Sequence, residues 1–167
     1  MPLLTVLASL LLTVASLTTP SVAKADDNRV SPDIFLGQYN LKKDIYGLCD
    51  PHLQVLKSEP LSGNDLEIYM GRYDFLNVNQ PRRSYNDELS SGWYESYTTA
   101  QSQMIYKGHD YTKANGEYTD DKTVATLSKD GNTLHIVYRS FSDIGGDKFT
   151  TVTECVYTRE APPKPQF

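Results

Sequence analysis

The chain has 167 residues, of which 16 are basic and 21 are acidic, so its formal net charge at pH 7 is −5. This length accommodates a single domain with a core of its own. Nucleic acids and anionic membrane surfaces are excluded as partners, because phosphate binding needs clustered lysine and arginine, and Arg82-Arg83 is the only adjacent pair of arginines.

Residues 1–25 are typical of a secretory signal peptide. An apolar run at residues 3–15 is followed by the small-residue pattern Ala23-Lys24-Ala25, where cleavage is expected. A retained membrane anchor is the alternative. It is disfavoured because a span needs about 20 apolar residues, and this run is shorter and interrupted by hydroxyl side chains. We therefore expect a secreted or periplasmic protein with no membrane span in the mature chain.

Residues 26–34 are charged and contain Pro32, which predicts a disordered leader before a β domain at residues 35–159. Alternation of apolar and polar residues predicts strands at residues 35–43, 53–57, 66–69, 73–78, 93–99, 103–107, 122–128, 133–141 and 149–157. Turn residues predict corners at residues 46–51, 62–65, 115–116, 130–132 and 143–147. Residues 79–92 form a long polar loop and the expected flexible flap. The proline-rich tail, residues 160–167, cannot join a sheet and is expected to be disordered.

The two cysteines, Cys49 and Cys155, are expected to form one structural disulfide. An exported chain folds in an oxidising compartment, and the sequence has no Cys-x-x-Cys or cysteine–histidine metal spacing. Two free thiols or a pair of intermolecular bridges are the alternative. The bridge would close a loop of roughly 100 residues, for which the chain-entropy estimate is about 4–5 kcal/mol of stabilisation.

The expected fold class is all-β, because nine or ten short strands are predicted and no amphipathic helix. A barrel is favoured over a two-sheet sandwich, since the connections are short and local and the disulfide would join the first strand region to the last. The sequence therefore predicts an antiparallel meander closed into a small β-barrel of about eight strands.

Several features resemble the lipocalin-like (calycin) β-barrels. They are Gly37-Gln38-Tyr39 on the first strand, the early Cys49 and the late Cys155 after an export signal. That family begins with Gly-x-Trp on strand one, and here Tyr39 stands at the tryptophan position. The resemblance is architectural and covers residues 35–159. It implies that a small apolar or amphipathic molecule binds in the barrel.

Aromatic content is the strongest indication of a binding site, with twelve tyrosines, five phenylalanines and one tryptophan. The aliphatic residues of the 66–69 and 133–141 strands are expected to face inward, and Tyr138 shares their face by alternation. By analogy, two inward pairs are expected on the 93–99 and 103–107 strands. The predicted ligand-binding residues are Trp93, Tyr97, Met104, Tyr106 and Tyr138. The 79–92 loop would gate them. A packed core is the alternative, because an eight-stranded barrel is narrow enough to fill itself.

Catalytic and metal-binding signatures are absent from the sequence. It has no Gly-x-Ser-x-Gly, no P-loop and no His-Glu-x-x-His. The three histidines are scattered, and a solvent-facing role is favoured for His135. Oxygen ligands for calcium are available at Asp110, Asn115, Glu117, Asp120 and Asp121, but their spacing does not match an EF-hand loop, which favours a solvated acidic turn. We therefore expect no metal and no other cofactor, and an enzyme is the less favoured class.

A filled barrel that binds another protein is the alternative function. Such a protein would bind an extracellular partner, or inhibit a secreted enzyme, through exposed tyrosines and the loop that contains Arg82-Arg83. Tyrosine suits such contacts because it offers a large contact area at a small cost in conformational entropy.

Overall fold

The computed structural model describes residues 28–58 and 67–161. These residues form ten β-strands and one 3₁₀ helix. In chain order the elements are η1 (Pro32–Phe35), β1 (Gly37–Asp44), β2 (His52–Ser58), β3 (Glu67–Met70), β4 (Tyr73–Phe75), β5 (Arg83–Asn86), β6 (Ser90–Thr98), β7 (Gln103–Thr112), β8 (Glu117–Leu127), β9 (Thr133–Ile144) and β10 (Asp147–Arg159). The predicted signal peptide, the corner at residues 62–65 and residues 162–167 of the tail lie outside the described residues.

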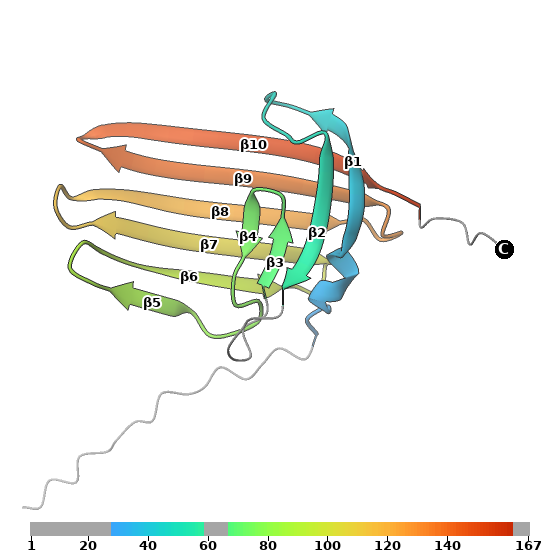
Figure 1. The fold of residues 1–167 in the computed structure, drawn as a ribbon, viewed down its shortest axis with the longest axis horizontal. Helices are drawn as coiled ribbons and strands as arrows, with labels where there is room; N and C mark the ends of the chain where they lie inside the picture. The colour runs from blue at the N-terminus through green and yellow to red at the C-terminus, as the bar shows by residue number, and fades with distance from the viewer. Residues whose placement is uncertain (1–27, 59–66, 162–167) are drawn as a thin grey trace, which may run out of the picture.

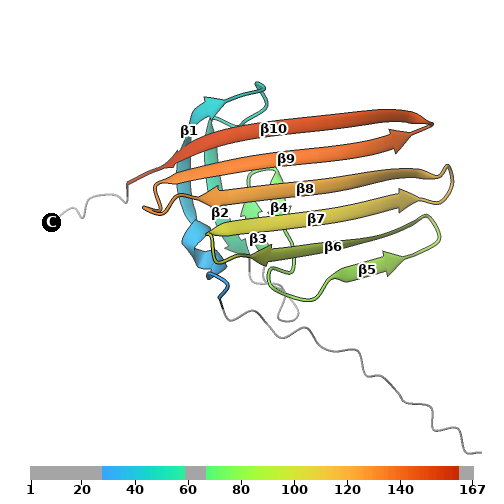
Figure 2. The same ribbon diagram turned by 180° about the vertical axis from the view of Figure 1, so that it is seen from behind.

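All ten strands belong to one antiparallel sheet, which confirms the all-β meander. Their order is β4-β3-β2-β1-β10-β9-β8-β7-β6-β5, so the first four strands and the last six are joined by the pairing of β1 with β10. The sheet bends at this junction. Strands β1–β4 consequently lie over one end of the long strands, whose other end extends beyond them (Figures 1 and 2).

The predicted closed barrel is wrong, because the described sheet keeps two open edges, β4 and β5. After β4 the chain crosses to β6, where Val78 forms one isolated bridge with Ser96 and the Asn79 amide donates to the Ser96 carbonyl at 2.8 Å. Strand length explains the open edges. β3 and β4 have four and three residues, whereas β9 and β10 have 12 and 13, so the short strands cannot pair along the long ones.

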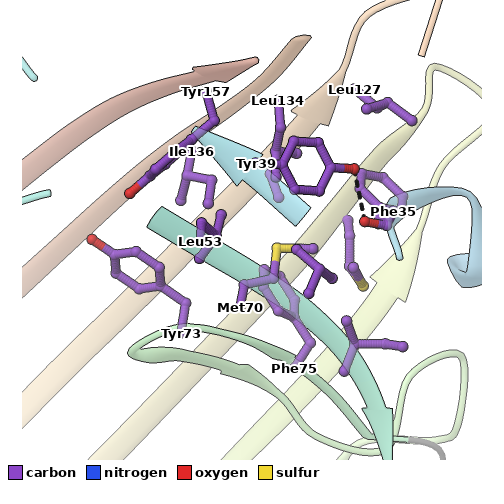
Figure 3. Packing of buried hydrophobic residues seen from close by; sticks show 14 of the residues in the cluster. Phe35, Tyr39, Leu53, Met70, Tyr73, Phe75, Leu127, Leu134, Ile136 and Tyr157 are labelled. Carbon is purple, nitrogen blue, oxygen red and sulfur yellow. Dashed lines mark hydrogen bonds between the residues drawn. The ribbon is translucent and has the colours of Figure 1, made fainter. Parts of the chain in front are cut away.

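The hydrophobic core lies between β1–β4 and the covered end of the long strands (Figure 3). The largest fully buried side chains include Phe35, Tyr39, Ile68, Met70, Phe75, Met104, Leu134, Ile136 and Tyr157. The Tyr39 hydroxyl donates to the Phe35 carbonyl at 2.8 Å and accepts from Arg159 Nε at 3.0 Å. The first strand, the last strand and η1 therefore meet at one end of the core.

The leader predicted to be disordered is partly ordered. Pro32 begins η1, and the Ser31 side chain accepts from the Asp33 amide at the N-cap. Proline is suited to this position because its missing N–H would have no partner in the first helical turn. Val30 and Ile34 pack against the core, and Phe35 is completely buried. Ordered structure thus begins before Phe35, where the sequence pattern had placed its start.

Cys49 and Cys155 form the predicted disulfide, with their Cα atoms 5.8 Å apart. Asp44 orders the loop that carries Cys49, because its carboxylate accepts from the backbone amides of Cys49 at 2.9 Å and Gly47 at 2.6 Å. These hydrogen bonds lower the pKa of Asp44, and the one from the Cys49 amide has the largest effect. The disulfide indicates an oxidising, extracytoplasmic compartment. Within residues 28–58 and 67–161, no helix is long and apolar enough to cross a membrane.

Tyr157, in the core, makes the stability of the fold depend on pH in the alkaline range. Burial is the main cause that raises its pKa from 10.0 to about 12. Since the folded state favours the neutral phenol, this contribution is fully present below the unfolded pKa and is lost as pH rises through the folded pKa. We expect the urea midpoint to fall between about pH 10 and about pH 12, and to fall less in Tyr157→Phe. Equal losses in the two proteins would contradict this role for Tyr157.

Candidate functional site

A cavity of about 450 Å³ lies where the short strands stop covering the long ones. Its lining comes from the loop after β1, from the β4 region and from the inner faces of β7–β10. The lining residues are Leu48, Arg72, Tyr73, Asp74, Leu76, Tyr106, Asp121, Thr123, Tyr138, Thr151 and Thr153. Small-molecule sites have volumes of roughly 300–1,000 Å³, so this cavity is large enough for a small ligand.

Three tyrosines form the apolar walls of the cavity. The rings of Tyr73 and Tyr138 contact each other with their centroids 5.8 Å apart. Burial raises the pKa of Tyr73, Tyr106 and Tyr138, so each keeps its proton at neutral pH and can donate a hydrogen bond. The Tyr138 hydroxyl donates to Asp121 Oδ1 at 2.8 Å. The site thus combines ring faces with polar groups that can orient a ligand.

Glycines allow tyrosine rings to lie against the inner face of the sheet. A Cβ atom at Gly108 would meet the Tyr106 hydroxyl oxygen at 2.5 Å, and one at Gly92 would meet the Tyr85 hydroxyl oxygen at 2.5 Å. The Tyr85 hydroxyl also donates to Asp110 Oδ1 at 2.6 Å. Tyrosines and aspartates therefore continue from the cavity onto the uncovered part of the sheet. A smaller hollow of about 60 Å³ there shares Tyr106 and Asp121 with the cavity.

The structure brings two of the five predicted ligand residues, Tyr106 and Tyr138, together in the cavity. Met104 also faces inward, but it is completely buried in the core. Trp93 and Tyr97 project from the opposite, outer face. Successive side chains of a strand alternate between faces, and on β6 the buried residues are Ser96 and Thr98. Trp93 and Tyr97 were expected to face inward, but the inward-facing positions of β6 are shifted from them by one residue.

Trp93 belongs to a row of rings on the outer face. Centroid distances along the row are 6.5 Å from Trp93 to His109, 6.0 Å from His109 to Tyr118 and 5.9 Å from Tyr118 to Phe141. The guanidinium carbon of Arg82 lies 4.0 Å from the centroid of the Trp93 ring. Such cross-strand pairs stabilise neighbouring strands, so the row supports β6–β9 where β1–β4 do not cover them.

Two polar segments differ from their prediction. The 79–92 flap contains β5 and the first residues of β6, which pair with each other. The expected acidic turn is mostly strand, because β7 continues to Thr112 and β8 begins at Glu117. Asp120 contacts His109 at 2.8 Å on the outer face, whereas Asp121 lies in the cavity. No group of three or more His, Cys, Asp or Glu side chains that could hold a metal occurs in the described part of the chain.

Sequence reasoning missed Tyr73 and Asp121 as lining residues. A signal for Asp121 was present, because it precedes the buried Thr123 and Ala125 by two and four residues and so shares their face. No local signal identified Tyr73. It reaches the cavity because the bend in the sheet brings β4 against β7.

Comparison of the chain with protein-family models, curated proteins and solved structures found no match. The resemblance to lipocalin-like barrels therefore stays a prediction.

Proposed function

We propose that this is an exported binding protein that holds one small, partly apolar molecule in the cavity of its bent sheet. The observation that carries the proposal is the cavity of about 450 Å³ with walls formed by Tyr73, Tyr106 and Tyr138. Tyrosine rings supply apolar contact area and their hydroxyl groups supply hydrogen bonds. Ligand sites commonly combine an apolar lining with a few polar groups that fix orientation.

Export is consistent with this function. The disulfide and the signal-like residues 1–25 support a secreted or periplasmic protein, which would capture its ligand outside the cytoplasm. The cavity faces the uncovered part of the sheet, so a ligand would enter from solvent without unfolding the core.

Native mass spectrometry of the oxidised, exported protein tests the proposal. We expect a small-molecule mass that is released on denaturation. Tyr106→Ala combined with Tyr138→Ala should weaken binding of that molecule at least tenfold, because two of the three tyrosine walls of the cavity are removed. Tyr97→Ala is the matched control, since Tyr97 lies on the outer face of the same sheet. Unchanged affinity in the double variant would move the site elsewhere.

A second candidate, a protein-binding module, is favoured by apolar side chains at the free ends of the hairpins. Leu89, between β5 and β6, is 75% exposed, and Phe149, near the β9–β10 turn, is 53% exposed. These hairpins end on the same side of the molecule (Figure 1). Arg82, the contact expected from the sequence, is instead engaged by Trp93 and Glu95. A native spectrum with a co-exported protein and no small molecule would favour this candidate.

A further inference from the structure

The lining of the cavity is acidic. It contains Asp74 and Asp121, and its only basic side chain among the described residues is Arg72. Arg72 forms an ion pair at 3.3 Å with Asp50, which lies outside the lining. Asp50 therefore compensates the positive charge of Arg72. Neither Asp74 nor Asp121 forms an ion pair with any described residue. Among the described residues, the lining therefore presents more negative than positive charge to a ligand.

Asp121 is surrounded by aromatic rings as well as by polar groups. One of its oxygens accepts from Tyr138, and its strand partner Gly108 lies beneath the tip of the Tyr106 ring. The Tyr106 hydroxyl has no hydrogen-bond partner among the described residues, although its ring is partly buried. A carboxylate flanked by tyrosine rings, in a partly covered cavity, is an environment that attracts cations.

From this arrangement we infer that the ligand of the cavity is a small organic cation, with an ammonium group bound by Asp121 and an apolar body packed against Tyr73, Tyr106 and Tyr138. This inference rests on the proposed binding function. An ammonium group gains a charge-assisted hydrogen bond from the carboxylate and a cation–π contact from the rings. A neutral hydroxyl of the same size can still donate to the carboxylate, but it gains neither the attraction between opposite charges nor the cation–π contact, and an anionic group is repelled by the aspartates.

Three probes with the same phenyl ring separate these cases: phenethylammonium, phenethyl alcohol and phenylpropionate. Isothermal titration of the oxidised protein should give phenethylammonium an affinity about tenfold or more above that of phenethyl alcohol, with phenylpropionate weakest. Asp121→Asn should remove most of the preference for the cation and leave the affinity for the alcohol within about twofold. The amide can still accept from Tyr138, so the fold should be retained.

Asp120→Asn is the matched control, because Asp120 is the neighbouring aspartate on the same strand and contacts His109 on the outer face. It should leave all three affinities unchanged. Equal or tighter binding of the alcohol or of phenylpropionate would overturn the inference, as would the failure of all three probes to bind. The native mass spectrum tests the proposed binding function separately. A neutral or anionic molecule released on denaturation would support the binding function but contradict the inference that the ligand is a cation.

Discussion

Replacement of the cysteine pair, as Cys49→Ser together with Cys155→Ala, is expected to lower the free energy of unfolding by about 3–5 kcal/mol. The bridge spans 106 positions, so its loss releases a long closed loop in the unfolded chain. It also ties the loop after β1 to β10, and the pairing of these strands joins the two halves of the described sheet. Removal of the bridge therefore raises the entropy of the unfolded chain and also loosens the junction in the folded state. Urea denaturation of the oxidised protein and of the double variant measures the difference.

The wild-type protein denatured in the presence of a reductant provides the control for this experiment. Its free energy of unfolding should match that of the double variant, because neither chain carries the bridge. A loss of less than about 1 kcal/mol in both would mean that strand pairing and the shared core hold the two halves together without the bridge.

Phe35→Ala is expected to cost about 3–5 kcal/mol, the range found when a buried phenylalanine is truncated. Phe35 is 0% exposed and ends η1, where it fills one end of the core beneath Tyr39. Truncation leaves a void between η1 and the first and last strands. The last strand, β10, is far from η1 in sequence, so a local shift of the chain cannot close the void. The free energy of unfolding in urea gives the cost.

Phe149→Ala is the matched control for Phe35→Ala. Phe149 is the same residue type, but it is 53% exposed near the β9–β10 turn, so its truncation should change stability by about 0.5 kcal/mol or less. Losses of about 0.5 kcal/mol or less in both variants would show that the Phe35 side chain of η1 does not contribute to the core. A small loss in Phe35→Ala alone would lead to the same conclusion.

The strands were predictable wherever one face is apolar. The pattern at residues 133–141 lies within β9 because Leu134 and Ile136 alternate with more exposed residues. The pattern at residues 103–107 ended too early, since β7 continues to Thr112. Beyond Tyr106 no second layer formed by the described strands covers the inner face, so apolar alternation is not required there (Figure 1). The uncovered part of a sheet thus loses the signal by which strands are recognised.

The candidate site was predictable where a strand contains aliphatic residues that set its phase. Tyr138 follows Leu134 and Ile136 on β9, and Tyr106 follows Met104 on β7, so these tyrosines were correctly placed inward. β6 contains no aliphatic residue. Its buried positions, Ser96 and Thr98, are polar, and the rings of Trp93 and Tyr97 point outward, which reversed the expected pattern. The inward orientation of Trp93 and Tyr97, which had been inferred by analogy with other strands, was therefore wrong.

The sequence by itself determined the all-β class, most of the strands and the Cys49–Cys155 pair. Residue alternation is a local property, and two cysteines in an exported chain leave one intramolecular pairing. Only the tertiary structure decided that the sheet stays open, that β4 approaches β7 and that Asp121 joins three tyrosines around a cavity. These features depend on relative strand lengths and on where the sheet bends. Both arise from contacts between residues distant in the chain, which no local pattern records.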